Sequence, residues 1–162
     1  MKPPFTSKTT SRRLLIMSEA VSKRHQPKEP IPAIERYEGV FFGVVRKLKR
    51  EGKLQGVDIV IVSQEYGIIG PNSKVPYYES KSKDFGSRID LTKDEVEKIR
   101  RENLVKLASI IKEMHSSEII INVGKAYLKL IEGLEDLTRA KIIQVEGRSL
   151  GLKAKKLREI MI

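Results

Sequence analysis

The sequence contains no cysteine and no tryptophan, and the first absence excludes several kinds of chemistry. Without cysteine there is no disulfide, no thiol nucleophile, no cysteine-ligated zinc site and no iron–sulfur cluster. The two histidines, His25 and His115, are not at a metal-ligand spacing, so no metal site is predicted. No Gly-x-Ser-x-Gly motif occurs, so nothing indicates a serine hydrolase.

Long hydrophobic runs are also missing. No apolar stretch approaches the roughly 18 residues of a membrane-spanning helix. The first residues, Met1-Lys2-Pro3-Pro4, lack the apolar core of a secretory signal. These features predict a cytoplasmic protein without a membrane partner.

Basic side chains are abundant and unevenly placed. The chain carries 32 Lys and Arg against 21 Asp and Glu, a net charge of +11. Residues 1–50 alone hold 12 basic and 4 acidic side chains. Such a surplus indicates attraction to phosphate polyanions. The alternative is the Lys- and Glu-rich surface common in thermophile proteins.

At 162 residues the length is typical of one domain, which we expect to span residues 12–162 after a disordered leader at residues 1–11. Short apolar runs predict four strands and helical periodicity predicts four helices. The expected strands are Arg12–Met17, Val57–Val62, Glu118–Val123 and Lys141–Val145, and the expected helices are Tyr37–Glu51, Thr92–His115, Lys125–Leu134 and Leu150–Ile162.

This alternation of strands and helices is typical of right-handed βαβ units. It predicts an α/β fold, a single three-layer domain whose mainly parallel four-stranded sheet has helices on both faces. In such sheets the functional loops gather at the carboxyl ends of the strands.

Four loops are therefore expected to meet at one edge. Their glycines allow close approach of a ligand, their cations suit phosphates, and their tyrosines offer stacking faces. The candidate ligand-binding residues are Ser22, Lys23, Arg24, Ser63, Tyr66, Gly67, Tyr77, Gly124, Lys125, Gly147 and Arg148.

Each of these loops also has a plain structural interpretation. Gly124-Lys125 lacks the flanking residues of a phosphate-binding P-loop and is usually only a turn. No catalytic residue is singled out, and no cofactor is predicted. If the chain is an enzyme, loop carboxylates must do the chemistry, and the candidates are Glu65, Glu79, Asp84 and Glu146.

Several short motifs, in order along the chain, resemble those of an uncharacterised family of small α/β domains. They are Ser22-Lys23-Arg24 after the first strand, Tyr37 at a helix start, Ser63-Gln64-Glu65-Tyr66-Gly67 with its Ser-x-x-Tyr-Gly pattern, Pro76-Tyr77, and Gly147-Arg148-Ser149-Leu150-Gly151 before the last helix. That family looks distantly similar to the peroxide-stress protein family and to a domain of archaeosine synthases. The resemblance implies nucleobase or nucleic-acid contacts. Its usual early cysteine is absent here, where the chain reads Glu19-Ala20-Val21, and its usual Ala-Lys is Gln64-Glu65.

Three functional hypotheses follow from these residues. The first is a protein that binds a nucleotide, RNA or DNA at the carboxyl edge of its sheet. The second is an enzyme acting on an N-glycosidic bond of a nucleoside or modified transfer RNA base. The third is a protein interaction module, with a homo-oligomer formed through the C-terminal helix as one form of it.

Overall fold

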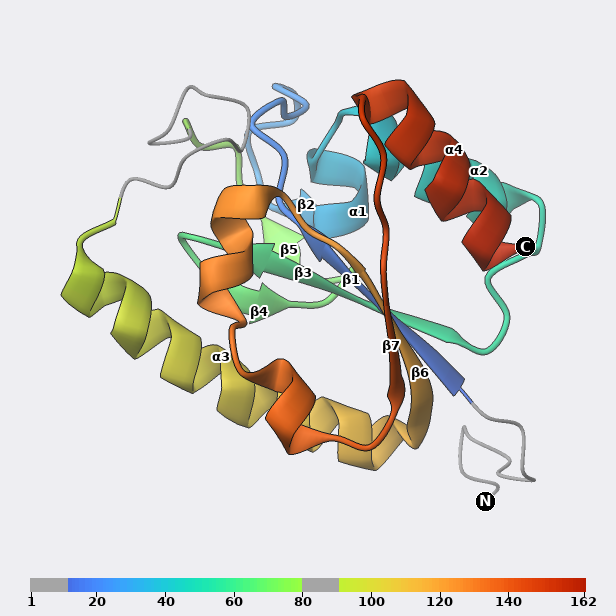
Figure 1. Cartoon of the computed structure of the whole chain (residues 1–162). Coiled ribbons are helices and arrows are strands. Elements are labelled where there is room, and N and C mark those ends of the chain that lie inside the picture. The colour runs from blue at the N-terminus through green and yellow to red at the C-terminus, as the bar shows by residue number, and fades with distance from the viewer. Residues whose placement is uncertain (1–11, 80–90) are drawn as a thin grey trace, which may run out of the picture.

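The fold is built on a five-stranded sheet with the order β4-β3-β1-β6-β7 (Figure 1). The structure is a computed structural model, and it describes residues 12–79 and 91–162, so the predicted leader at residues 1–11 lies outside it. The strands are β1 (Arg12–Ser18), β3 (Val57–Ser63), β4 (Gly67–Ile69), β6 (Ser116–Asn122) and β7 (Lys141–Gln144). β1, β3, β6 and β7 are parallel, as predicted, and β4 runs antiparallel to β3.

The main sheet has five strands, one more than the four predicted. β4 has only three residues, which is shorter than the apolar runs by which strands are recognised, and it follows β3 through a tight turn. Gly67 begins it at a φ of 71°, a left-handed conformation that suits glycine. The antiparallel strand therefore arises from turn geometry rather than from a hydrophobic pattern.

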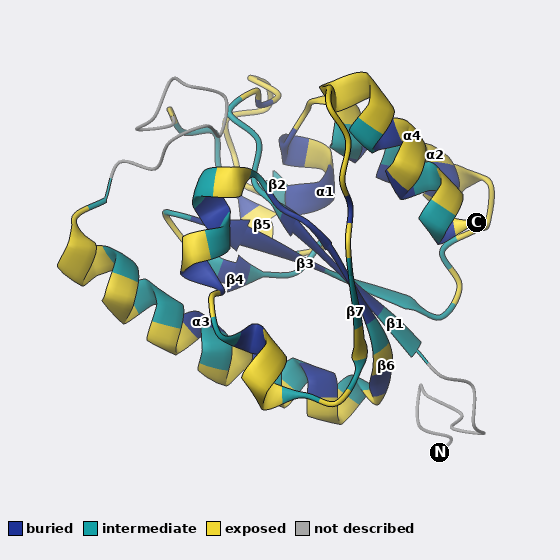
Figure 2. Cartoon of the chain, in the orientation of Figure 1, coloured by how far each residue is buried: buried dark blue, intermediate teal, exposed yellow. Residues whose placement is uncertain are grey.

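Residues of β1 alternate between two hydrophobic clusters, one on each face of the sheet. Leu14 and Ile16 pack with residues of α3 (Lys93–Met114), and Leu15 and Met17 pack with residues of α2 (Val40–Arg50) and α4 (Leu150–Met161). Figure 2 shows the strands largely buried and the outer sides of the helices exposed. Because both faces of β1 are covered by helices, side chains that point to either face are buried, and this explains why its sequence is continuously apolar instead of alternating.

The segment after β6 is not the predicted α-helix. It forms two short 3₁₀ helices, η1 (Lys125–Leu130) and η2 (Leu134–Leu137), that lie on the α3 side of the sheet (Figure 1). Gly133 separates them at a φ of 99°. The apolar residues are spaced suitably for a helix, but the left-handed glycine interrupts it after six residues.

The proline-containing stretch after β1 folds into short elements around a buried cation. These are β2 (Ile31–Pro32), α1 (Ala33–Arg36) and β5 (Lys74–Val75), with β2 paired to β5. Arg36 is fully buried, and its guanidinium donates to the carbonyl oxygens of Val75, Arg24 and Glu29 at 3.0, 2.6 and 2.7 Å. One side chain thereby joins three loop segments.

The helix α3 begins with a capping box. Thr92 Oγ1 accepts from the Glu95 amide at 3.2 Å, and Glu95 Oε1 accepts from the Thr92 amide at 2.9 Å. We expect Thr92→Ala to lower the free energy of unfolding by about 1 kcal/mol, as measured by urea denaturation. Ser109→Ala, at an exposed position inside the same helix, serves as control and is expected to change it by less than about 0.5 kcal/mol. Equal effects of the two substitutions would contradict a role for the cap.

No helix in the described part of the chain is long and apolar enough to cross a membrane.

Candidate functional site

A glutamate directly follows the central strand β1, and its carboxylate accepts four short hydrogen bonds. Glu19 Oε1 accepts from Ser63 Oγ at 2.9 Å and Tyr78 Oη at 2.5 Å. Its Oε2 accepts from the Gln64 amide at 2.7 Å and Tyr127 Oη at 2.9 Å. These four donors occupy the four lone-pair positions of the carboxylate, so we describe Glu19 as saturated.

Three tyrosines around Glu19 are held in their protonated form. Tyr37 donates to Tyr78 Oη at 2.5 Å, since the proton of Tyr78 points to the carboxylate. Burial, and after it the negative charge of Glu19, raises the pKa of Tyr37, Tyr78 and Tyr127. The network therefore has one anion and several neutral donors, which stabilise it.

Lys23 is a buried cation that lies beside the same network. It is 5% exposed, donates to the carbonyl oxygen of Val21 at 3.1 Å, and lies 4.4 Å from the ring centre of Tyr78. Burial lowers its pKa, and the nearby charge of Glu19 acts in the opposite direction. Lys23 thus balances the charge of Glu19 inside the fold instead of presenting its ammonium group to solvent.

A pocket of about 180 Å³ opens beside this network, at the carboxyl ends of β1 and β6. Its walls come from the loop after β1, the first turn of α2, the end of β6 and the first turn of α4. They are formed by Ser18, Glu19, Ala20, Val21, Ser22, Glu38, Gly39, Val40, Phe41, Phe42, Asn122, Gly124, Leu150 and Lys153. We call it the β1–β6 pocket.

Asn122 is the most unusual residue of the β1–β6 pocket. It is 3% exposed, and neither its Nδ2 nor its Oδ1 has a hydrogen-bond partner. Its neighbour Ile120, two positions earlier on β6, packs with α2 and α4, so Asn122 faces the same side of the sheet. A buried amide without partners costs about 1–3 kcal/mol, and such groups in folded proteins usually serve a purpose.

The helix α2 begins at the wall of the pocket. Its N-cap is Gly39, which has no side chain to accept a hydrogen bond from the first amides of the helix. The first turn also contains no acidic residue. The amides of Val40, Phe41 and Phe42 are thus available to a ligand, and together they form a partly positive group.

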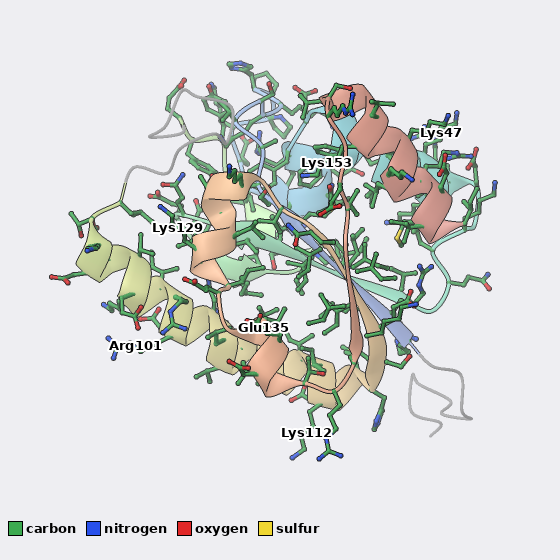
Figure 3. All side chains as sticks on the ribbon, in the orientation of Figure 1. Lys47, Arg101, Lys112, Lys129, Glu135 and Lys153 are labelled. Carbon is green, nitrogen blue, oxygen red and sulfur yellow. The ribbon has the colours of Figure 1, made fainter. Side chains whose placement is uncertain are left out.

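Lys153 reaches the same pocket from α4 (Figure 3). Its Nζ lies 3.5 Å from the carbonyl oxygen of Val123 and 5.6 Å from the ring centre of Phe41. Burial lowers the pKa of this ammonium group. Within residues 12–79 and 91–162, no carboxylate forms a salt bridge with it.

Gly147 fixes how closely the loop after β7 approaches α4. A Cβ atom at this position would lie 2.7 Å from the backbone nitrogen and 2.9 Å from the Cα of Lys153. These contacts are shorter than a side chain tolerates, so residue 147 must be glycine for Lys153 to keep its place. Gly147 thereby supports the pocket without lining it.

The predicted ligand-binding residues are distributed over several environments. Ser22 and Gly124 line the β1–β6 pocket, and the Gly124 amide donates to Ser18 Oγ at 3.1 Å. Ser63 is buried in the Glu19 network, where its Oγ also accepts from the amides of residues 65 and 66. Exposed positions are held by Arg24, Tyr66, Lys125 and Arg148.

Tyr77 and Gly67 lie outside the pocket. Tyr77 stacks on His25 with ring centres 4.7 Å apart and donates to Glu79 at 2.6 Å. Lys28 Nζ lies 4.1 Å from the centre of the Tyr77 ring. A Cβ at Gly67 would come within 3.1 Å of Asn103 Oδ1, so this glycine serves close packing against α3.

The carboxylates considered for catalysis are also outside the pocket. Glu65 is exposed, and Glu79 is occupied by Tyr77 at the surface. Glu146 is exposed beside a separate hollow of about 330 Å³ formed with α4. Asp84 lies outside the described residues. Across the described ranges, no group of three or more His, Asp or Glu side chains lies close enough together to hold a metal ion.

A larger hollow of about 590 Å³ runs along the amino-terminal half of β3. Its lining is mainly apolar, with Lys49 and Asp58 as its charged residues. No buried polar atom without a partner lines it among the residues described. The β1–β6 pocket is smaller, but it combines a buried amide, a cation and a free helix end, so we take it as the candidate functional site.

Sequence reasoning did not select Glu19, Asn122 or Lys153. Signals for them existed, because Glu19 and Asn122 stand at the ends of buried strands. Lys153 shares the apolar face of its helix with Ala154 and Leu157. Their burial and partners depend on contacts between distant segments, which a pattern along the chain does not contain.

Comparison with known proteins shows a similar fold and no known function. No known family model matches the chain, and no curated protein matches it in sequence. Its structure is similar to the crystal structure of AF0587, a protein of unknown function, with a TM-score of 0.54 and 13% sequence identity. The similarity covers 93% of this chain and 44% of that one, so this chain corresponds to less than half of the other protein.

Proposed function

We propose that this protein binds a nucleotide, free or as part of a nucleic acid, with one base in the β1–β6 pocket. The observation that carries the proposal is Asn122, whose amide donor and acceptor are both buried and unpartnered at the pocket wall. A carboxamide pairs with a ligand edge that has a donor next to an acceptor. Nucleobase edges have this pattern, and Asn pairs in this way with adenine.

The size and lining of the pocket suit a single flat group. Its volume of about 180 Å³ is below the roughly 300–1,000 Å³ of pockets that enclose drug-sized ligands. Val40 and Leu150 line it and are 44% and 65% exposed, so apolar surface is available at the entrance. A base that enters between them buries its faces and brings its edge to Asn122.

Basic residues near the pocket favour a phosphate-bearing ligand. Lys125 directly follows the pocket residue Gly124, and Arg148 stands two positions before Leu150. Both cations are exposed. The net charge of +11 adds a general attraction to nucleic acids.

Binding is a better interpretation than cleavage of an N-glycosidic bond. Glu19 lines the pocket, but its saturated carboxylate has no free lone pair to stabilise a sugar cation or to activate water. Glu79 and Glu146 do not line the pocket. Self-association through the C-terminal helix is also less well supported, because the apolar residues Ala154, Leu157 and Met161 of α4 are buried inside the fold.

Asn122→Leu tests the proposal with two measurements. We expect the variant to lose at least tenfold in affinity for the best ligand among adenosine, guanosine, cytidine and uridine, their 5′-monophosphates and a short single-stranded RNA. In the absence of ligand, the same variant should keep or gain stability, by up to about 1 kcal/mol, because it removes a buried amide that has no partner. Calorimetric titration and urea denaturation provide the two values.

Asn72→Leu, at an exposed position away from the β1–β6 pocket, is the matched control and should leave binding unchanged. Two results count against the proposal. One is the absence of binding by every member of the panel at low salt, and the other is unchanged affinity of Asn122→Leu.

A further inference from the structure

The β1–β6 pocket has a second polar region that Asn122 does not explain. It consists of the first amides of α2 and the ammonium group of Lys153, which line the same pocket, and Lys153 Nζ lies 5.6 Å from the ring centre of Phe41 in the first turn of α2. Both are donors, and neither faces an acidic partner in its own helix turn. Apart from the long contact of Lys153 Nζ with the carbonyl oxygen of Val123, at 3.5 Å, these donors can be offered to acceptors of a ligand.

We infer that the amides of Val40, Phe41 and Phe42 and the side chain of Lys153 bind the phosphate monoester of the nucleotide. This inference rests on the proposed function, because it assigns the second half of the same ligand. A helix start with free amides attracts an anion, and a lysine beside it adds a full positive charge. The unpartnered Asn122 in the same pocket independently indicates that a ligand enters there.

The other charges of the pocket are compatible with an anion at this position. The carboxylate of Glu19 is saturated by its four donors and is balanced by Lys23. Glu38 is exposed, so water screens its charge. Lys153 is partly buried, and burial lowers its pKa, as expected of a cation that lacks a counter-charge.

The hydrogen-bond donors and acceptors of the base and of the phosphate decide which part of the pocket each one binds. A phosphate offers only acceptors, so it satisfies amides and an ammonium group but leaves Asn122 Oδ1 without a donor. A base edge offers both and suits Asn122. The pocket thus binds the base at the end of β6 and the phosphate between α2 and α4.

The experiment compares a nucleoside with its 5′-monophosphate. For the best base of the panel, the monophosphate is expected to bind the wild-type protein about tenfold or more tightly than the nucleoside. Lys153→Met removes the charge but keeps an unbranched apolar side chain, and it should reduce this ratio to about threefold or less. Lys155→Met, at an exposed position of the same helix, should leave the ratio unchanged.

A second variant tests the amides of α2 directly. Val40→Pro removes one of the three donors at a position where proline is compatible with a helix start. The preceding Gly39 has a φ of 107° and a ψ of 168°, so it lies outside the α region that a following proline disfavours. This variant should weaken binding of the monophosphate and of inorganic phosphate severalfold, and its effect on the monophosphate should exceed its effect on the nucleoside, which meets only the altered side chain.

The possible failures are separable. If nucleoside and monophosphate bind the wild-type protein equally, the phosphate assignment is wrong and the proposed function stands. If they bind unequally but Lys153→Met keeps the full ratio, the phosphate is bound elsewhere and the assignment is overturned. If neither ligand binds at low salt, both the assignment and the proposed function are wrong.

Discussion

We expect Arg36→Met to lower the free energy of unfolding by about 4 kcal/mol, the largest effect of any single substitution considered for this protein. Arg36 is fully buried, and its guanidinium donates to three backbone carbonyl oxygens, those of Val75, Arg24 and Glu29. Methionine fills a similar volume but donates to none of them. Each buried acceptor that loses its donor costs about 1–3 kcal/mol.

Urea denaturation followed by circular dichroism measures the loss. Arg24→Met is the matched control, because Arg24 is exposed and its nearest carboxylate, that of Glu35, lies 3.7 Å away at the surface. We expect the control to change the free energy by less than about 0.5 kcal/mol. If Arg36→Met does not fold, Arg36→Lys, which keeps the charge and fewer donors, should give an intermediate loss. A stability of Arg36→Met equal to that of the wild type would show that the three carbonyls do not depend on it.

A second large effect is expected in alkaline solution. Tyr37, Tyr78 and Tyr127 have a raised pKa in the folded state, because of burial and then of the charge of Glu19. In the unfolded chain they titrate near the ordinary value of about 10. Above that pH the unfolded state releases three protons that the folded state retains, so stability falls as pH rises.

The sign and size of the change in folding stability with pH follow from the number of protons that the folded state retains. Below about pH 10 the tyrosines are protonated in both states and their contribution to stability is complete. Above it, three retained protons give a loss of about 4 kcal/mol per pH unit. Lys23 and Lys153 act oppositely, since burial lowers their pKa, but their contribution is complete once the pH reaches the ordinary value for lysine.

Urea denaturation between pH 8 and 11 would measure this dependence. Tyr127→Phe should reduce the slope above pH 10 by about a third. At pH 7 the same variant should lose about 1–2 kcal/mol, because it removes a hydrogen bond to a carboxylate. Tyr66→Phe, which alters a tyrosine that is 38% exposed, should have a much smaller effect on both values. A pH-independent stability across this range would contradict the protonated tyrosine network.

The parallel part of the sheet could be predicted because each strand has its own local signal. β1, β3 and β6 are runs of apolar residues, and the long helix α3 has both periodicity and a capping box. β4 could not be predicted, because three residues have no measurable pattern and their pairing depends on the turn at Gly67. The break at Gly133 likewise depends on a left-handed backbone rather than on composition.

The sequence indicated the edge of the sheet at which the candidate pocket lies, but only two of the pocket's residues. The expectation that function lies at the carboxyl edge pointed to the loops that contain Ser22 and Gly124, and both line the pocket. The Glu19 network joins residues 59 and 108 positions apart, and no local pattern indicates that they meet. Lys23 was among the expected ligand-binding residues, but its side chain is buried and does not line the β1–β6 pocket.

The saturation of Glu19 has a consequence for how the pocket opens and closes. Its four donors come from three separate parts of the chain, namely the end of β3 with the turn that follows it, the chain after β5, and η1. If any of them detaches, the charge of Glu19 loses a partner in a poorly solvated position, and the remaining contacts become less favourable. These segments therefore form one cooperative unit in local unfolding, and the rim of the β1–β6 pocket stays ordered or is lost as a whole.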